Sequence, residues 1–404
     1  MIDVAHIRKE FPILQRTVAG KPMVYLDNTA TSQAPMRVVD EISRIYTHSR
    51  ANVHRGVHTL SQEMTMLQES CREKVRAFVN ASSIEEIVFT RGTTESINLV
   101  ASSFGETLKE GDEIILTVME HHANIVPWQL LRERKGVVLK VVDINEKGEL
   151  DLEQYKSLFS DRSVLAAFCH VSNVLGTVNP VKEMTAYAKG RGVRVLIDGA
   201  QASPHLEIDV QELGCDFYAF SSHKMYGPSG VGVLYGRKEL LEKMPPWQGG
   251  GEMISVVTFA HTTFADLPFK FEAGTPDYIG IAAFSKALEF IEEIGIREME
   301  THETALAAIA ERELREIEGI IIYGEASKKS PVISFLFKGA HPYDLGMLLD
   351  KQGVEVRTGH HCAMPLMERL GIPGTVRASF AVYNTEEEVE MLVKAVRRAA
   401  EILR

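Results

Sequence analysis

The sequence predicts an α/β protein with a mainly parallel sheet, followed by a smaller α+β domain at the C-terminus. Two observations lead to this prediction. From about residue 87 to 235, short apolar strands alternate with helical patterns, an order that typically gives parallel strands with helices on both faces of the sheet. Beyond about residue 317 the alternation changes to a few strands joined by helices and loops, which is typical of a small α+β layer.

The apolar runs of the first part are predicted to be the strands of the large sheet. They are residues 87–90, 113–118, 137–142, 164–171, 194–198, 217–220 and 231–235. Small polar or charged residues follow several of these runs directly. Because the carboxyl ends of parallel strands open onto one crevice, we expect those residues to converge there.

The remaining elements complete a two-domain prediction, which a length of 404 residues favours. Helical patterns cover about residues 3–14, 35–49, 59–79 and 278–317, the last of which should link the domains. The C-terminal strands are predicted at 332–337, 354–357 and 375–381, before a last helix to Leu403. We therefore expect a large domain over residues 20–290 and a small domain made of residues 1–19 and 291–404.

The composition excludes several classes of protein. A net charge of −11 argues against a nucleic-acid partner and against an anionic membrane surface. Residues 1–9 lack the apolar core of a signal peptide, and no apolar run approaches the length of a membrane span. The four cysteines are scattered without a C-x-x-C pair, so neither a disulfide framework nor a metal site is expected. The expected location is the cytoplasm.

Two neighbouring strand ends carry the first chemical signal. The strand 194–198 ends in Asp198, and Lys224 lies just after the strand 217–220. A lysine at the tip of a buried strand is costly without a partner or a task, although a solvated hairpin lysine is the alternative for this stretch alone. A carboxylate and a lysine at adjacent strand ends suit pyridoxal 5′-phosphate (PLP): the amine bonds the cofactor aldehyde, and the carboxylate keeps the pyridine nitrogen protonated. Desolvation would favour the neutral, reactive amine.

A second signal follows the strand 87–90. Gly92 precedes Thr93 and Thr94 at the start of a helical pattern. Backbone N–H and hydroxyl groups at such a start point at one spot and, with the helix dipole, attract anions. An ordinary N-cap is the alternative for a Thr-Thr pair on its own. Together with the lysine motif, the pair predicts a phosphate-binding site.

These segments resemble the fold-type I PLP enzymes of the class V aminotransferase group. The matching strings are Asp198-Gly-Ala-Gln201 and Ser221-Ser-His223-Lys224-Met-Tyr-Gly227-Pro228. Within that group, Arg357-Thr-Gly-His-His-Cys362-Ala-Met-Pro365 is similar to the Suf-type cysteine desulfurases. Matches run from Tyr25 to Thr385, so they cover nearly the whole chain. The resemblance implies a PLP fold-type I large domain and a small α+β C-terminal domain that carries the catalytic cysteine.

The resemblance also implies roles around the cofactor ring. His121 would stack on the ring and take part in catalysis with Lys224, as both stacking and proton transfer suit an imidazole; a structural histidine is the alternative. Asn173 would lie beside the cofactor oxygen and the substrate carboxylate. Gln201 would bond the phenolic oxygen of the cofactor.

On the phosphate side, the resemblance implies that Ser221 and His223 are ligands. Thr275 would reach the phosphate of the partner subunit, and the loop 52–58 lies near the active site in similar enzymes, partly across a dimer interface. The alternative for that loop is plain solvent exposure. A shared site requires a symmetric homodimer.

Cys362 is the expected sulfur-transfer residue. It follows adjacent histidines, with Arg357 upstream, and a cysteine near imidazoles and a cation tends towards the nucleophilic thiolate. A buried, inert cysteine is the alternative. Arg377 would hold the substrate α-carboxylate, for which a guanidinium fork is suited, and Arg357 is expected to help bind substrate.

The resemblance therefore implies an L-cysteine desulfurase that forms alanine and a persulfide on Cys362. The sulfur would pass to an acceptor protein for iron–sulfur cluster assembly, and Tyr343 weakly favours an acceptor without zinc. Selenocysteine lyase or transaminase activity is one alternative, and a non-enzymatic sulfur-relay scaffold is another. Intact Lys224, Asp198 and Thr93-Thr94 argue against the scaffold.

Overall fold

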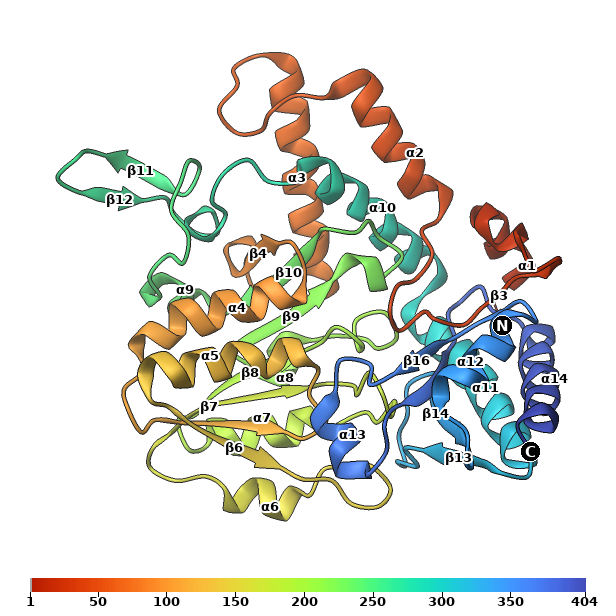
Figure 1. Ribbon diagram of the computed structural model, residues 1–404. Coiled ribbons are helices and arrows are strands. Elements are labelled where there is room, and N and C mark those ends of the chain that lie inside the picture. The colour runs from red at the N-terminus through yellow and green to blue at the C-terminus, as the bar shows by residue number, and fades with distance from the viewer. Residues whose placement is uncertain (1) are drawn as a thin grey trace.

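A seven-stranded sheet forms the centre of the larger part of the molecule in the computed structural model, which describes residues 2–404 (Figure 1). Its strands, in spatial order, are β4 (Ile87–Thr90), β10 (Gly232–Gly236), β9 (Phe217–Ser221), β8 (Arg194–Asp198), β7 (Ser163–Cys169), β5 (Glu113–Thr117) and β6 (Val138–Val142). The neighbours from β9 to β6 are parallel, while β10 runs antiparallel to both β9 and β4. The predicted α/β class with a mainly parallel sheet is confirmed.

Helices cover both faces of this sheet because its central strands are apolar on both sides. In β8, Val195 and Ile197 join one core and Leu196 joins the other, as the alternation of side chains along a strand requires. One face is covered by α4 (Thr93–Ser103) and α5 (Val126–Lys135). The other face is covered by α3 (Thr59–Phe78), α7 (Val181–Lys189) and α10 (Tyr278–Ile294).

A second, antiparallel sheet lies in the C-terminal part and has its own core. Its strands, in spatial order, are β13 (Ile320–Tyr323), β14 (Val332–Phe337), β17 (Thr375–Ser379) and β16 (Arg357–Gly359). Side chains of α11 (Ile296–Arg315), α12 (Pro342–Asp350) and α14 (Glu386–Leu403) join the same core. This arrangement is the predicted small α+β layer.

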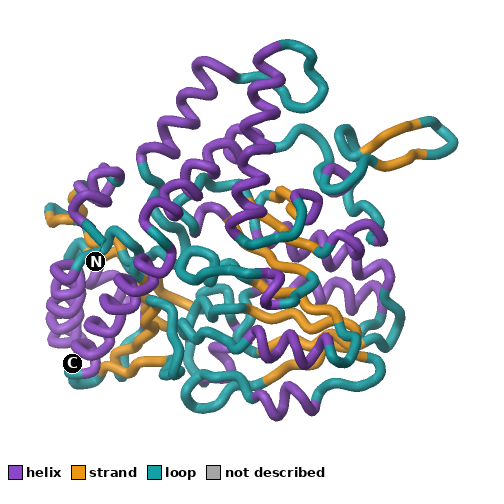
Figure 2. Tube along the Cα trace, turned by 180° about the vertical axis from the view of Figure 1, so that it is seen from behind, coloured by secondary structure: helices purple, strands orange, loops and turns teal. Residues whose placement is uncertain are grey.

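The N-terminal segment contacts this smaller part of the molecule. Its strand β3 (Val24–Tyr25) pairs in parallel with β15 (Val354–Glu355). Arg8 also donates to Glu388 Oε1 at 2.9 Å, which ties the first residues to α14. Figures 1 and 2 accordingly show the two chain ends on the same side of the molecule.

Several predicted elements have different boundaries in the structure. The long helix expected over 278–317 is two helices, α10 and α11, because Gly295 between them adopts a φ of +91° that ends the first. The opening helix is reduced to α1 (Val4–Ile7) and two 3₁₀ turns, the second beginning at Pro12. The strand expected over 354–357 splits into β15 and β16, which belong to different sheets.

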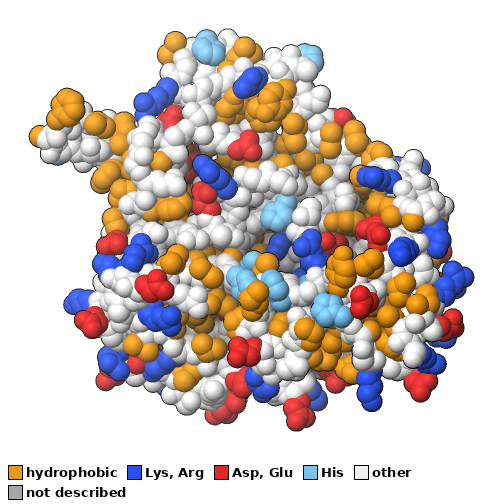
Figure 3. All heavy atoms as spheres, in the orientation of Figure 1, with side chains coloured by type: hydrophobic (Ala, Val, Ile, Leu, Met, Phe, Trp, Pro, Cys, Tyr) orange, Lys and Arg blue, Asp and Glu red, His pale blue; other side chains and the backbone are white. Residues whose placement is uncertain are grey.

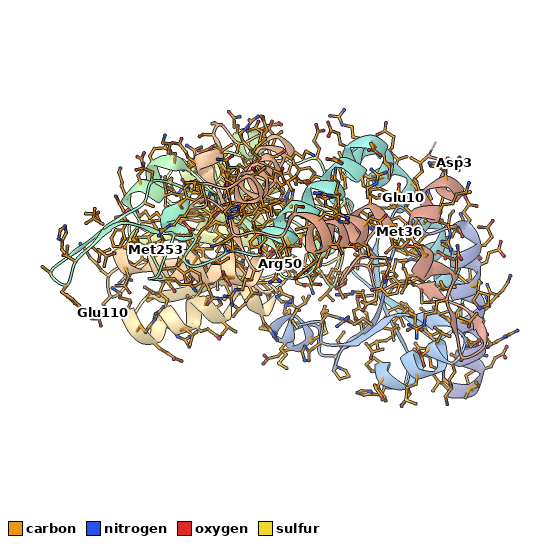
Figure 4. All side chains as sticks on the ribbon, turned by 90° about the horizontal axis from the view of Figure 1, so that it is seen from above. Asp3, Glu10, Met36, Arg50, Glu110 and Met253 are labelled. Carbon is orange, nitrogen blue, oxygen red and sulfur yellow. The ribbon has the colours of Figure 1, made fainter. Side chains whose placement is uncertain are left out.

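A hairpin of β11 (Ile254–Val257) and β12 (Thr262–Phe264) was not foreseen in the sequence. The hairpin projects from the body of the molecule (Figure 1). In the view from above, Met253 at the base of the hairpin and Glu10 near the N-terminus lie on opposite sides of the molecule (Figure 4). Phe259 at its tip is fully exposed, and Val257 is 60% exposed.

The remaining elements are short or peripheral. They are β1 (Thr17–Val18), β2 (Lys21–Pro22), α2 (Met36–Arg44), α6 (Leu152–Ser157), α8 (Val210–Leu213), α9 (Lys238–Lys243) and α13 (Met364–Leu370). Among residues 2–404, no helix combines the length and apolar character needed to cross a lipid bilayer.

Candidate active site

A cavity of about 250 Å³ opens at the carboxyl ends of the parallel strands. Histidine and cationic side chains gather near the centre of the corresponding face (Figure 3). Every predicted site residue except Thr275 lines the cavity: Thr93, Thr94, His121, Asn173, Asp198, Gln201, Ser221, His223, Lys224, Arg357, Cys362 and Arg377. Residues from both ends of the chain and from both sheets therefore meet at one place.

The lysine and the aspartate are placed by neighbouring parallel strands. Asp198 ends β8 opposite Ala219 of β9, and Lys224 lies in the 3₁₀ turn that follows β9. Burial lowers the pKa of Lys224 to about 8, against the opposing pull of the Asp198 carboxylate. Burial raises the pKa of Asp198. Burial thus favours the neutral, reactive amine of Lys224. A cationic hydrogen-bond donor would stabilise the ionised carboxylate of Asp198 beside it.

Asp198 has unused hydrogen-bonding capacity. Its Oδ1 accepts the Ala200 N–H at 3.0 Å, and the carboxyl makes no other hydrogen bond to the described residues. The residue is only 5% exposed, and its second oxygen is available to a group in the cavity. A ligand with a protonated ring nitrogen would supply the missing donor.

His121 presents a neutral imidazole to the cavity. Its Nδ1 accepts the Ala123 N–H at 3.1 Å, which leaves the ring proton on Nε2. Burial, with a smaller contribution from the charge of Lys224, lowers the pKa of His121 to about 3. The ring is therefore a hydrogen-bond donor through Nε2 at neutral pH.

The N-terminus of α4 forms the anion-binding end of the cavity. Thr93 donates its N–H to Ser221 Oγ at 2.8 Å, so the helix start is held against the end of β9. A Cβ added to Gly232 would lie 2.3 Å from the Cα of Gly92, so glycine is needed for the backbones to approach this closely. With the Thr94 backbone, this arrangement gathers donors where a phosphate would be stabilised.

Two arginines also line the cavity. Arg377 is buried, and burial lowers its pKa to about 10. It donates to the Asn173 carbonyl at 2.9 Å and to Asp27 Oδ1 at 3.3 Å. Arg357 donates to the same Asp27 carboxylate, with Nη2 2.8 Å from Oδ2. A guanidinium in this setting can bind a carboxylate from the cavity.

Cys362 lies exposed on a strained loop at the cavity wall. His361 and Cys362 have φ values of +51° and +55°, which non-glycine residues adopt only when other contacts enforce them. Here the enforcing contacts are made by the His360 side chain and the His122 backbone. Cys362 donates its N–H to His360 Nδ1 at 3.0 Å, and its carbonyl accepts the His122 N–H at 2.7 Å.

His122 completes this clamp, because its Nε2 accepts the Met364 N–H at 3.1 Å. The sequence prediction selected His121 alone from the adjacent pair. Both histidines have defined contacts, but His122 supports the backbone of the cysteine loop, whereas His121 lines the cavity.

The comparisons with known proteins agree with this geometry. The model of the aminotransferase class-V family matches residues 24–392. The chain belongs to the class-V aminotransferase family. Its relatives include cysteine desulfurases from Pectobacterium carotovorum subsp. carotovorum and Serratia proteamaculans, which are 48% and 50% identical over 402 residues. These alignments cover 99% of this chain, and 98% and 99% of the respective relatives.

Solved structures of cysteine desulfurases have the same fold as this protein. The Escherichia coli protein CsdA, in an S-sulfonic acid form, is 42% identical with a TM-score of 0.93 and full coverage of both chains. The apo structure from Thermococcus onnurineus NA1 is 40% identical with a TM-score of 0.95, and 99% of each chain is covered. The predicted PLP fold-type I architecture is confirmed.

The class-V family uses PLP, and the residues of this cavity fit that cofactor. The free carboxyl oxygen of Asp198 suits a protonated pyridine nitrogen, and the donors at the start of α4 suit a phosphate. Gln201 donates Nε2 to the Thr29 carbonyl at 2.8 Å, while its buried Oε1 has no partner among the described residues. A buried amide oxygen without a partner fits a position that meets a polar ligand.

Thr275 does not line the cavity that contains Lys224. It borders a separate hollow with Arg91, Glu95 and Gly274. The segment before it is fixed by Glu272, which pairs with the fully buried Arg72 at 2.6 Å. Breaking such a buried pair typically costs about 3–5 kcal/mol. The threonine is thus held at a defined place outside the cavity of its own chain.

Sequence reasoning missed other residues that shape the site. Asp27 was not among the predicted site residues, and its position between two arginines was not predicted. Glu120, which directly precedes His121, was also not among the predicted site residues. In the structure it is buried and bonds Thr117 Oγ1 at 2.6 Å and Asn124 Nδ2 at 2.7 Å, and burial raises the pKa of Glu120 to about 7. Its place directly before the histidine was the available signal.

Proposed function

We propose that this protein is a PLP-dependent L-cysteine desulfurase of the Suf type. It would convert L-cysteine to alanine and leave the substrate sulfur as a persulfide on Cys362. One observation carries the proposal: a single cavity contains the Lys224–Asp198 pair, the carboxylate-binding Arg377 and the exposed Cys362. The full-length similarity to cysteine desulfurases supports the same function.

The proposed roles follow from the contacts of each side chain. Asp198, Gln201, Ser221, His223, Thr93 and Thr94 would hold PLP, with His121 against its ring. When bound, PLP supplies an electron sink for negative charge developing at the substrate Cα. Lys224 would hold the cofactor aldehyde and, once released by substrate, remove the Cα proton.

Arg377 and Asn173 would orient the substrate carboxylate, with help from Arg357. Cys362, as its thiolate, would attack the substrate sulfur. A new S–S bond would form and the substrate C–S bond would break, with its electron pair left on Cβ. Cβ would take up a proton, and Lys224 would return a proton to Cα. The products are alanine and the Cys362 persulfide, and no external oxidant is required.

An acceptor protein would then collect the sulfur for iron–sulfur cluster assembly. Exposure of Cys362 supports direct access by such a partner. Tyr343 of α12 is 59% exposed, so an acceptor protein can reach it. We propose that this acceptor contains no zinc.

The cytoplasm is the proposed location, because a catalytic cysteine needs a reducing compartment to return to its thiol form. We also propose residues 20–290 as the large domain, with residues 1–19 and 291–404 forming the small one, since the two sheets have separate cores.

The decisive measurement supplies L-cysteine to the PLP-loaded protein and quantifies alanine and protein-bound persulfide together. We expect both products in equal amounts during the first turnover, with the persulfide located at Cys362 by mass spectrometry. Alanine without persulfide would instead favour lyase chemistry, for which L-selenocysteine is the natural comparison substrate because selenium leaves more readily. A keto-acid product would indicate a transaminase.

We further propose a symmetric homodimer. Three segments form one continuous exposed edge: Arg55 of the loop 52–58 pairs with Glu252 at 3.3 Å, and Gly274 donates to the Gly251 carbonyl at 2.9 Å. The apolar hairpin projects from this edge, and Val57 is 93% exposed. The position of Thr275 outside its own cavity supports a role in the partner's site.

We expect light scattering to give about twice the mass of one chain, because the exposed apolar residues of this edge would be buried by a second copy. Val57→Asp together with Phe259→Asp should shift the protein towards monomers by introducing like charges into that contact. A wild-type protein that is monomeric and fully active would contradict the shared-site proposal.

A further inference from the structure

A buried carboxylate outside the cavity lies where three parts of the fold meet. Glu303 belongs to α11, and its side chain is 0% exposed. Its Oε2 lies 2.7 Å from His205 Nδ1, and its Oε1 accepts the hydroxyl of Tyr226 at 3.1 Å. The proposed reaction gives none of these three side chains a task. Because an unpaired buried carboxylate is costly, Glu303 and its two partners hold one another in place.

The first partner, Tyr226, lies two residues beyond Lys224. Its φ of +61° is rare for a bulky residue, so the surrounding contacts must enforce that backbone. The Tyr226 hydroxyl accepts the Val382 N–H at 3.3 Å, which leaves its own proton for Glu303. The Tyr226 N–H donates to Ser32 Oγ at 2.7 Å. Glu303 therefore helps to hold a strained turn, and the orientation of Lys224 depends on that turn.

The second partner, His205, lies in the loop that follows Asp198, and its side chain is 6% exposed. Turn hydrogen bonds run through this loop. Ala202 and Ser203 donate to the Gly199 carbonyl at 3.0 and 2.9 Å. His205 in turn donates its N–H to the Ala202 carbonyl at 3.0 Å. Fixing the His205 side chain therefore fixes the far end of the loop whose start carries the Asp198 carboxylate.

We propose that Glu303 is a positioning residue for the pair formed by Lys224 and Asp198. One carboxylate ties the turn after β9 and the loop after β8 to α11, a helix whose other side chains join the core of the second sheet. Glu303 takes no chemical step of its own and acts through Lys224 and Asp198, so this inference rests on the proposed function.

The test follows PLP attachment to the cofactor-free protein by visible absorbance and by borohydride fixation at Lys224. In Glu303→Gln we expect attachment at pH 7 to slow about tenfold, because a neutral amide holds the tyrosine hydroxyl and the imidazole more weakly than a carboxylate does. Tyr226→Phe removes only the hydroxyl and should slow attachment in the same way. The double variant should be no more than about twofold slower than the slower single variant, since both changes remove the same contact.

The pH profile separates positioning from a general loss of stability. Burial is the largest influence on Lys224 and lowers its pKa to about 8. A lysine on a loosened turn is less buried, so its pKa rises and less of the amine is neutral at a given pH. In both Glu303→Gln and Tyr226→Phe the midpoint of attachment should therefore move up by about one pH unit, whereas a purely structural role would leave the midpoint unchanged.

Tyr155→Phe is the matched control. Tyr155 is as deeply buried as Tyr226, at 1% exposed, and its hydroxyl donates to the Met184 carbonyl at 2.9 Å, outside the cavity. Its attachment rate and pH midpoint should equal those of wild type even where its melting temperature falls. A wild-type rate and midpoint in Glu303→Gln, or equal slowing in all three single variants, would overturn the inference.

If Glu303→Gln fails to fold, Tyr226→Phe decides the question. It keeps the aromatic ring and its packing against Phe11 and Phe290, and wild-type attachment in this variant would then overturn the inference. Absence of borohydride-fixed PLP at Lys224 in the wild-type protein is a different result, because it would refute the proposed function and this inference with it.

Discussion

Replacing Lys224 with alanine is expected to lower alanine formation from L-cysteine by at least about 10⁴-fold, the upper end of the contribution of one positioned acid–base group. The loss should be this large because the same amine has two duties. It would hold the cofactor aldehyde, and it would later remove the substrate Cα proton. Lys182→Ala is the matched control, since Lys182 is 65% exposed and pairs with Glu212 away from the cavity.

The Lys224 assignment can also be checked without turnover. Borohydride should fix PLP covalently to the wild-type protein at Lys224 and should fix none in Lys224→Ala. Since burial lowers the pKa of Lys224 to about 8, the neutral fraction of this amine in the cofactor-free protein rises as pH increases through about 8. PLP attachment should therefore accelerate over this window, from about pH 7 to pH 9. Fixation to a different lysine would refute the assignment.

Replacing Cys362 with serine is expected to reduce alanine formation by at least about 10²-fold while PLP binding is kept. A serine hydroxyl stays protonated near neutral pH and is a poor nucleophile towards sulfur. The side chain is exposed at the cavity wall, so the change leaves no buried gap. Protein-bound persulfide at this position should disappear, whereas cleavage of L-selenocysteine should survive in part because selenium needs less assistance to leave.

The matched control for this variant is Cys71→Ala. Cys71 is fully buried in α3, and burial raises the pKa of Cys71 to about 12, so its sulfur stays protonated and inaccessible. This variant should retain both turnover and persulfide. The measurements are the visible absorbance of bound PLP, alanine by chromatography, and persulfide by mass spectrometry. Turnover of L-cysteine by Cys362→Ser at nearly the wild-type rate would contradict the persulfide mechanism.

The central sheet was predictable because its signal is local. Each strand is a short apolar run followed by polar residues, and the rule that parallel strands open at one edge brought Asp198, Ser221 and Lys224 together. The break at Gly295 was less visible, because the apolar helical pattern continues on both sides of a single glycine. The β11–β12 hairpin was missed since its exposed apolar residues pack on no core of this chain, and turn signals alone did not define its strands.

The cysteine side of the cavity could be predicted only in part. The string around Cys362 marked the residue, but nothing local indicated that His122, far away in sequence, holds its loop. Asp27 illustrates the same limit, because its two arginine partners lie 330 and 350 positions along the chain. Charge balance of this kind depends on which strands become neighbours, and a single sequence does not state that pairing.

The pairing of β3 with β15 has a consequence for synthesis on the ribosome. Residues 24–25 emerge early, but their partner strand is translated near the end, and Arg377 follows later still. At about 5–20 residues per second, roughly 8–30 s separate the emergence of Lys224 from that of Arg377. The nascent chain can thus complete the lysine end of the cavity while the arginine end is still being made. The N-terminal strand β3 stays without its partner strand until residues 354–355 have been made.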